Sequence, residues 1–356
     1  MSLRIVIAED SAIFAEVLLD VLRAEPGIEI VAMTDNGVDV VNLCEEHRPD
    51  LVLMDIHMPR QDGLAATEAI MARCPTPILV VTADPHRGGV DLSFKALSAG
   101  ALDLMPKPQC LPFPEGEREA LLRKIRLLSQ IPVVRHVRGR KRQGIERPRL
   151  TPQTTPRNAA DRPVAVVGVV ASTGGPRALA GIVGQLPADF PAAITVVQHI
   201  THGFSTHLAH WLDNHSPLTV VEAREGMALK RGHLYIAPTE RHMMLEPDLK
   251  LSVVEGPPVG GHCPSGDRLL TSLARHAAPR AIGVILSGMG DDGTVGLTAM
   301  HHTGCPTLAQ DETSSVVYGM PRSAIAHGVI DRVVDIDQLA DALIREVEKL
   351  QQRERA

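Results

Sequence analysis

Aromatic residues, paired cysteines and long apolar runs are scarce or missing in this chain of 356 residues. Aromatics make up 2% of the sequence, too few for the stacking platform that binds single-stranded nucleic acid. The formal net charge of −6 also argues against general nucleic-acid binding. The five cysteines are scattered and form no C-x-x-C spacing, so we expect reduced thiols rather than a disulfide framework or a zinc site.

Signals for membrane insertion and export are also lacking. The sequence contains no run of about 18 apolar residues, so we expect no transmembrane helix. The first apolar run stops at Glu9, which is not the pattern of a signal peptide. These absences predict a cytoplasmic protein. The hydrophobic fraction of 44% and the chain length are what two globular domains require.

The first domain is expected at 1–130, where strand and helix patterns alternate. Short apolar runs predict strands at 3–8, 28–33, 51–54, 77–81 and 101–104. Amphipathic segments predict helices at 12–24, 36–46, 64–72, 90–98 and 117–130. Because strict alternation of strands and helices builds a parallel sheet covered on both faces, this half predicts an α/β domain.

A basic, proline-containing segment at 131–162 has no apolar period. Its Arg135–Arg149 stretch holds seven Lys or Arg residues against one Glu. This composition is typical of a linker, and the basic run is interpreted as a solvated tether. Docking on an acidic partner or a membrane surface is the alternative that its charge leaves open.

The second domain is expected at 163–350 and repeats the α/β pattern without sharing a motif with the first. Strands are predicted at 164–170, 193–197, 218–221, 281–286 and 306–309. Helices are predicted at 176–185, 203–213, 267–278, 293–302 and 337–349. The stretch 233–254 predicts strands joined by tight turns, with a small antiparallel hairpin at the sheet edge. The expected fold is doubly wound and mainly parallel.

Five polar side chains follow strands of the first domain: Glu9, Asp10, Asp55, Thr82 and Lys107. A single acid at a strand end is most often a solvated cap. All five should converge, however, because parallel strands end at one edge of a sheet. Clustered carboxylates favour a cation, and an all-oxygen ligand set suits Mg²⁺. Thr82 adds a hydroxyl group and Lys107 an ammonium group beside these carboxylates. The combination predicts that one of the carboxylates accepts a phosphoryl group.

These residues lie in the motifs I-V-I-A-E-D-S, L-V-L-M-D-I-H-M-P-R-Q-D-G, V-V-T-A and M-P-K-P, and this half resembles the flavodoxin-like receiver domain of two-component response regulators. The resemblance implies that Asp55 is the phospho-acceptor and that Thr82 and Lys107 contact the phosphoryl group. It also implies a cis peptide bond at Lys107–Pro108. The implied Mg²⁺ ligands are Glu9, Asp10, Asp55 and the backbone carbonyl of His57. One departure is Leu104, where many receivers carry a switch aromatic.

In the second domain, V-V-G-V-V-A-S-T-G-G-P predicts a buried strand that ends at Ser172 and a helix that begins near Pro176. A serine needs a base and an orienting group to act as a nucleophile. His199 ends the next predicted strand, and Asp291 and Asp292 follow the strand at 281–286. If these three strands are neighbours, Ser172, His199 and one aspartate meet at one sheet edge. Backbone N–H groups around Met289 would then offer an oxyanion hole.

The sequence argues against two other kinds of site in this domain, a phosphate site and a metal site. A glycine-rich turn at a helix N-terminus also suits a phosphate, but neither G-x-G-x-x-G nor G-x-x-x-x-G-K-[ST] occurs. The chain has 16 histidines, yet none has metal-ligand spacing such as H-E-x-x-H. The sequence A-S-T-G-G also differs from the G-x-S-x-G elbow of α/β hydrolases, although catalytic triads are recognised by geometry.

The second domain resembles the catalytic domain of the chemotaxis protein-glutamate methylesterase/glutamine deamidase family. The motifs that carry the resemblance are G-V-V-A-S-T-G-G-P, V-V-Q-H-I, G-H-L-Y-I-A-P, P-S-G-D-R-L, L-S-G-M-G-D-D-G and A-Q-D-E-T-S-S-V-V-Y-G-M-P. By resemblance Ser172 is the nucleophile, His199 the base and Asp292 its orienter. The N–H of Met289 is an oxyanion donor, and Thr173 lies beside the site. The sequence I-T-H-G-F after Gln198–His199 departs from the family's M-P-P-G-F.

The resemblance implies a phosphorylation-activated serine hydrolase that demethylates glutamate γ-methyl esters on the cytoplasmic helices of a methyl-accepting chemoreceptor, and that could also deamidate glutamines. The phosphodonor would be a chemotaxis-type histidine kinase, and the esterase would need no cofactor. The alternative is an adaptor whose second domain binds a receptor or kinase without turnover. A DNA-binding regulator has less support, because no helix-turn-helix pattern follows the linker.

Overall fold

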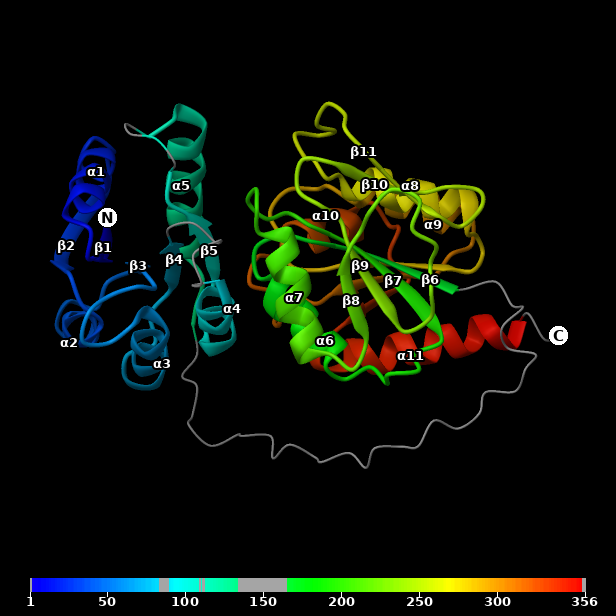
Figure 1. Ribbon diagram of the computed structural model, residues 1–356, viewed down its shortest axis with the longest axis horizontal. Coiled ribbons are helices and arrows are strands. Elements are labelled where there is room, and N and C mark those ends of the chain that lie inside the picture. Colours follow the sequence, from blue (N-terminus) through cyan, green and yellow to red (C-terminus); the bar gives the residue numbers. More distant parts are fainter. Residues whose placement is uncertain (1, 83–89, 109, 111–112, 134–164, 354–356) are drawn as a thin grey trace. The chain divides into compact units, whose positions relative to one another are not determined.

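The computed structural model describes residues 2–82, 90–108, 110, 113–133 and 165–353. These residues form one parallel sheet of five strands, one parallel sheet of seven strands and a two-stranded antiparallel sheet (Figure 1). The fold class predicted from the sequence is thereby confirmed. None of the helices in this described part is both long and apolar enough to cross a membrane. Almost all of the predicted linker at 131–162 lies outside the described residues.

The five-stranded sheet has the order β2-β1-β3-β4-β5. Its strands are β1 (Leu3–Ala8), β2 (Ile28–Thr34), β3 (Leu51–Met54), β4 (Ile78–Thr82) and β5 (Asp103–Pro106). Its helices are α1 (Ala12–Arg23), α2 (Gly37–His47), α3 (Gly63–Arg73), α4 (Val90–Ala99) and α5 (Glu115–Leu128). Since β1 has β2 on one side and β3 on the other, the strand order reverses there, which is where α/β sheets bind ligands.

The seven-stranded sheet has the order β14-β13-β12-β6-β7-β9-β8. Its strands are β6 (Ala165–Ala171), β7 (Ala192–Gln198), β8 (Thr219–Glu222), β9 (His233–Ile236), β12 (Ala281–Ile285), β13 (Thr307–Gln310) and β14 (Arg332–Val334). The strands that precede Ser172, His199 and Asp292 are β6, β7 and β12, and they are neighbours. Ser172, His199 and Asp292 can therefore meet at one edge of the sheet, because their strands are neighbours.

Helices cover both faces of this sheet, which explains why its central strands are buried along their whole length. On one face α6 (Gly175–Val183) packs against α7 (Ser205–His215) and α11 (Ile336–Arg353) (Figure 1). On the other, α8 (Gly266–His276) packs against α9 (Thr294–His302), which contacts α10 (Met320–Ala326). The prediction had missed α10 and β14, both of which are short.

The stretch 233–254 forms an antiparallel hairpin only in part. The hairpin consists of β10 (His242–Leu245) and β11 (Leu251–Val254), which pair with each other as a separate sheet that packs on α8. The preceding strand β9 instead lies inside the main sheet, parallel to both β7 and β8. Its apolar run Leu234–Ile236 is buried, as an internal strand requires. The expected antiparallel hairpin is therefore confirmed, but it forms a sheet of its own rather than an edge of the main sheet.

Candidate functional site

Three carboxylates meet at the point where the strand order of the first sheet reverses. Glu9 and Asp10 follow β1, and Asp55 follows β3; their oxygen atoms lie within 4.8 Å of one another. Glu9 and Asp55 are buried, whereas Asp10 is exposed. Carboxylates packed this closely repel each other unless a cation or a proton neutralises them, and a ligand set of oxygens fits Mg²⁺. The cluster is therefore typical of a magnesium site.

The backbone holds Asp55 in a tight loop. Its N–H donates to the carbonyl of Ala8 at 2.8 Å, and its Oδ1 accepts from the N–H of His57 at 3.3 Å. A Cβ atom on Gly63 would lie 2.2 Å from the carbonyl oxygen of Asp55, so only glycine lets α3 begin this close to the loop. The close approach explains why the sequence reads Asp-Gly at the start of this helix.

Thr82 and Lys107 lie at the ends of neighbouring strands, as the sequence predicts. The N–H of Lys107 donates to the carbonyl of Thr82 at 2.7 Å, and Thr82 is buried. The expected cis bond at Lys107–Pro108 is wrong, because cis bonds in the described residues precede only Pro264 and Pro279. The trans form is the ordinary one for a peptide bond before proline, and this sequence keeps it.

Ser172 lies between the end of β6 and the start of α6, at the edge where the seven-stranded sheet changes direction between β6 and β12. Its N–H donates to the carbonyl of Ser287 at 3.0 Å, which ties the turn to the loop after β12. Gly174 adopts φ 80°, and a Cβ there would lie 2.6 Å from Val316. Both the left-handed backbone and this close packing demand glycine. The G-G-P sequence thus turns the chain sharply behind Ser172.

Gln198, the last residue of β7, connects the serine to the histidine. Its side chain is buried, and its Nε2 donates to the carbonyl of Ser172 at 2.7 Å and to the carbonyl of His199 at 3.0 Å. Its Oε1 is buried and has no hydrogen-bond partner within the part of the chain that the structure describes, and a Cβ on Gly175 would lie 2.1 Å from it. The amide group of Gln198 therefore sets the spacing between the ends of β6 and β7. Only glycine fits at position 175, because any side chain there would clash with this amide group.

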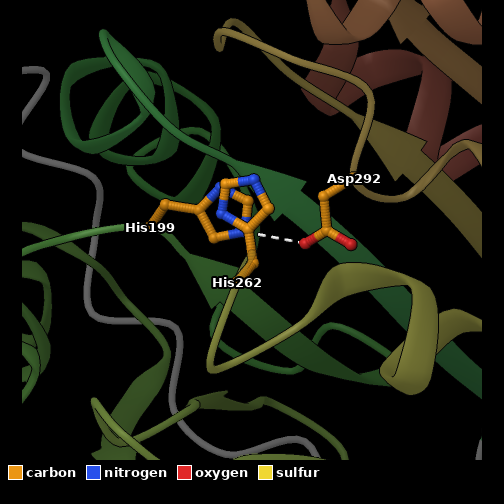
Figure 2. Close-up of side chains that lie close together, drawn as sticks. All are labelled: His199, His262 and Asp292. Atoms are coloured by element: carbon orange, nitrogen blue, oxygen red, sulfur yellow. Dashed lines mark hydrogen bonds and ion pairs between the residues drawn. The ribbon is translucent and has the colours of Figure 1, made fainter. Parts of the chain in front are cut away.

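His199 forms a hydrogen-bonded pair with Asp292 in the second sheet. The Nε2 atom of His199 lies 2.8 Å from Oδ2 of Asp292 (Figure 2), and both side chains are nearly closed to solvent. Asp292 is the buried member of the two adjacent aspartates, and Asp291 is exposed. The structure thus brings the second acid to the histidine, as the family resemblance implies.

The carboxylate of Asp292 is also held by the N-terminus of α8. It accepts from Ser265 Oγ at 3.0 Å and from the N–H groups of Gly266 at 2.6 Å and Asp267 at 3.0 Å. Burial raises the pKa of Asp292, but the hydrogen bond and charge of His199 and these N–H groups outweigh it and lower the pKa to about 2. Asp292 is therefore ionised at neutral pH, and the positive end of the helix stabilises it.

Because Asp292 binds Nε2 of His199, only the other ring nitrogen, Nδ1, can interact with a further group. Nδ1 is buried and has no hydrogen-bond partner among the described residues, Ser172 included. When a neutral imidazole donates from Nε2 to a carboxylate, its lone pair is on Nδ1, and such a nitrogen can accept a proton from a nearby hydroxyl group. Catalytic hydrogen bonds are often long in the absence of substrate, so an open Ser172–His199 pair agrees with such a role.

The loop after β12 completes the edge around Ser172. Ser287 is buried; its Oγ donates to the carbonyl of Thr173 at 2.7 Å and accepts from the N–H of Val317 at 2.9 Å. Met289 is 42% exposed, and no acceptor in the described part of the chain takes its N–H group. This N–H is thus open to bind a substrate oxygen.

The sequence argument missed several residues that hold this site together. Gln198 was seen only as part of V-V-Q-H-I, and Ser265 only as part of P-S-G-D-R-L. The pattern Ser265-x-Asp267 at the start of a predicted helix is a capping signal, and it could have indicated a helix N-terminus that binds an anion. For His262, the preceding Gly260–Gly261 pair signals a tight turn, but nothing in the sequence shows that the turn packs against His199.

Two family models match the chain. The model described as CheB methylesterase matches residues 167–343, and the model described as response regulator receiver domain matches residues 5–112. The two matched ranges do not overlap. The methylesterase match spans Ser172, His199 and Asp292, and the receiver match spans the acidic cluster and Lys107.

Curated proteins and a solved structure are similar over long stretches. A protein-glutamate methylesterase/protein-glutamine glutaminase 2 of Anaeromyxobacter dehalogenans is 45% identical, with 96% of each chain covered. The enzyme numbered 4 of Myxococcus xanthus is 41% identical with the same coverage. The crystal structure of the Thermotoga maritima CheB methylesterase catalytic domain covers 52% of this chain and 99% of its own, with 38% identity and a TM-score of 0.50.

Proposed function

Because the chain belongs to the protein-glutamate methylesterase/protein-glutamine glutaminase family, with a response regulator receiver domain, we propose that Ser172 is the nucleophile of this activity. The observation that carries the proposal is the His199–Asp292 pair, which ends beside the serine turn and leaves Nδ1 of the histidine free. A serine, a base and a buried carboxylate at one sheet edge are what acyl transfer through a covalent intermediate requires.

The reaction follows from the roles of these atoms. Ser172 Oγ attacks the γ-carbonyl carbon of a glutamyl methyl ester, and Nδ1 of His199 takes the hydroxyl proton. The carbonyl oxygen becomes an oxyanion that the Met289 N–H stabilises. His199 then returns the proton to the leaving methoxide, methanol departs, and a γ-glutamyl ester remains on Ser172. Asp292 stabilises the imidazolium and keeps the Nε2 proton in place.

Water completes the cycle by the same route. His199 takes a proton from the water that attacks the acyl-enzyme, and then returns it to Ser172 Oγ as glutamate leaves. A glutamine side chain yields the same acyl-enzyme, with ammonia as the leaving group in place of methanol. One arrangement of Ser172, His199 and Asp292 therefore serves both the esterase and the deamidase.

In the receiver domain we propose that Asp55 accepts a phosphoryl group. Its carboxylate attacks the phosphorus of a phosphohistidine, an O–P bond forms as the P–N bond breaks, and the donor's imidazole leaves. The ammonium group of Lys107 and the hydroxyl of Thr82 balance the charge on the transferred oxygens. A bound Mg²⁺ would supply charge neutralisation, held by Glu9, Asp10, Asp55 and the carbonyl of His57. The donor is a histidine kinase of a chemotaxis pathway. A phosphate adds about 1.5 to 2 negative charges, enough to repack a surface and regulate the esterase.

The substrate of the second domain is the cytoplasmic helical region of a methyl-accepting chemoreceptor. The I-T-H-G-F segment at 200–204 directly follows His199, and His202 and Gly203 line a cavity of about 460 Å³ with Glu222 and Arg241. This segment also departs from the sequence that is common in the family. It therefore adjusts the choice of receptor or the rate, while the chemistry stays with Ser172.

The direct test is demethylation of a purified, methyl-labelled receptor by the full chain. Ser172→Ala removes the attacking oxygen, so we expect release of labelled methanol to fall by at least about 10⁴-fold. Phosphorylation of Asp55 should be unaffected. Thr303→Ala removes an exposed hydroxyl at the end of α9 and is the control, and we expect it to retain the parental activity. Normal methanol release from Ser172→Ala would refute the assignment of the nucleophile and favour another mechanism.

A further inference from the structure

A two-residue turn places a second histidine next to the catalytic one. Val259 and His262 exchange backbone hydrogen bonds, with N–O distances of 3.0 and 2.9 Å. The two residues between them, Gly260 and Gly261, have φ angles of 58° and 86°. Two positive φ angles are what a tight type I′ turn needs, and they favour glycine. The sequence V-G-G-H therefore fixes the position of His262.

The ring of His262 lies flat on the ring of His199. Their centroids are 4.1 Å apart, and the ring planes differ by 14° (Figure 2). The His199 side chain is only 11% exposed, and His262 covers one of its faces. A ring held between a stacked neighbour and a hydrogen bond to Asp292 cannot turn about its side-chain bonds without losing both contacts.

The segment that carries His262 also binds the carboxylate of Asp292. Three residues after His262, Ser265 begins the group of donors that bind Asp292. The buried ring of His242 braces the segment, because its Nδ1 accepts from the N–H of Ser265 at 3.2 Å and its Nε2 donates to the carbonyl of Pro257 at 3.0 Å. Base and acid are thus positioned by one stretch of chain, residues 257–267.

The surroundings of His262 favour the neutral form of its ring. Burial and the neighbouring His199 lower the pKa of His262, and the carboxylates of Asp292 and Asp291 only partly oppose them. A neutral aromatic face is favourable beside a cation, and His199 becomes an imidazolium each time it takes the serine proton. A charged side chain at the same place would instead repel it.

The rings are badly placed for a shared metal ion. His199, His262 and Asp292 offer ligand atoms within 4.8 Å of one another, which invites that reading. However, an imidazole nitrogen binds a metal in the plane of its ring. Two nearly parallel rings 4.1 Å apart direct their lone pairs side by side rather than to one point. Asp292 is in addition committed to His199 and to α8.

We propose that His262 is a positioning residue for the methylesterase: its neutral ring, stacked on His199, holds the imidazole with Nε2 on Asp292 and Nδ1 toward Ser172. The inference rests on the proposed function, since it presumes that His199 is the base. His262 itself neither takes a proton nor contacts the reacting atoms. Its contribution is the orientation of the base, where a small displacement costs a large factor in rate.

Three variants of the full chain test this role with a methyl-labelled receptor. His262→Ala removes the stacked ring, so we expect kcat to fall about 10- to 100-fold while KM changes less than about twofold. His262→Phe restores a flat neutral ring, and we expect kcat within about threefold of the parent. His302→Ala removes an exposed histidine on α9 and serves as the matched control, with parental activity. Thermal unfolding of each variant shows that the second domain is folded.

Parental kcat in His262→Ala would overturn the proposal. So would a His262→Phe variant that is folded yet as slow as His262→Ala, because stacking would then not be the cause. Inhibition of the parent by stoichiometric Zn²⁺ that His262→Phe abolishes would favour a metal site over a stacked pair, and it would also overturn the proposal. These outcomes are separate from a failure of the proposed nucleophile, which an active Ser172→Ala would reveal.

Discussion

The acidic cluster of the receiver and the Ser172 edge of the methylesterase occupy the same kind of place, the carboxyl ends of strands where a parallel sheet changes direction. They differ in how their charge is balanced. Glu9, Asp10 and Asp55 crowd three carboxylates together, which favours binding of a cation. In the second domain, the single carboxylate of Asp292 is satisfied by His199 and the N-terminus of α8.

The difference separates a site that depends on an added ion from one whose charges are balanced within the protein. The receiver site suits charged groups that come and go, which are a bound metal ion and then a phosphoryl group. The esterase site needs a fixed geometry, and Gln198 and the 257–267 segment provide it. Loss of the ion or of the acceptor carboxylate from the receiver site should therefore leave the basal rate of the unphosphorylated esterase intact, and the predictions below use this independence of the basal chemistry.

The largest expected effect is on the receiver. Asp55→Asn removes the attacking carboxylate, so we expect no incorporation of phosphate from a small acyl phosphate donor, measured with a radiolabel. Chelation of Mg²⁺ should have the same effect on the parent. Asp20→Asn changes an exposed acid on α1 and is the matched control. The unphosphorylated esterase rate should be equal in all three proteins. A chelator that stops the basal esterase would show that the two sites are not independent.

A smaller effect is expected from Gln198→Leu in the second domain. The change leaves the carbonyls of Ser172 and His199 without their shared donor, so the two strand ends lose their fixed spacing. We expect kcat for demethylation to fall about 10- to 100-fold and the free energy of unfolding to fall by about 2–4 kcal/mol. Denaturation followed by the fluorescence of Trp211, the single tryptophan, reports on the domain that contains it.

Gln185→Leu is the control for that variant, because Gln185 makes one hydrogen bond to Gly181 at the end of α6, away from the serine turn. It should leave kcat unchanged, and it should change the free energy of unfolding by no more than about 0.5 kcal/mol. If Gln198→Leu behaves like Gln185→Leu, the shared amide does not set the geometry of the edge.

The smallest effect concerns stability in acid. The pKa of Asp292 is lowered from 3.8 to about 2 by folding, so its ionised form stabilises the folded state. This contribution, about 2 kcal/mol, is complete above about pH 4 and is lost as the pH falls toward 2. We expect the stability advantage of the parent over Asp292→Asn to shrink over that range in Trp211 fluorescence. A constant difference from pH 5 to pH 2.5 would contradict the electrostatic role.

The sequence predicts the two sheets and the residues at their edges well, because strands with buried faces and polar ends leave a clear local pattern. It predicts that Ser172 and His199 each follow a strand, but not that the two strands are neighbours, because strand order depends on tertiary packing. The internal placement of β9 was missed for the same reason. Gln198 and His262 act through contacts between segments far apart in the chain, and nothing in the local pattern distinguishes them from other polar residues.

The most direct measurement for the central claim is the site of covalent reaction with a fluorophosphonate, mapped by mass spectrometry on the full chain with and without a chelator. A serine activated by a metal-independent His–Asp pair should carry the phosphonyl adduct at Ser172 at the same rate in both conditions. An adduct at another residue, or a reaction at Ser172 that requires a divalent cation, would contradict the account.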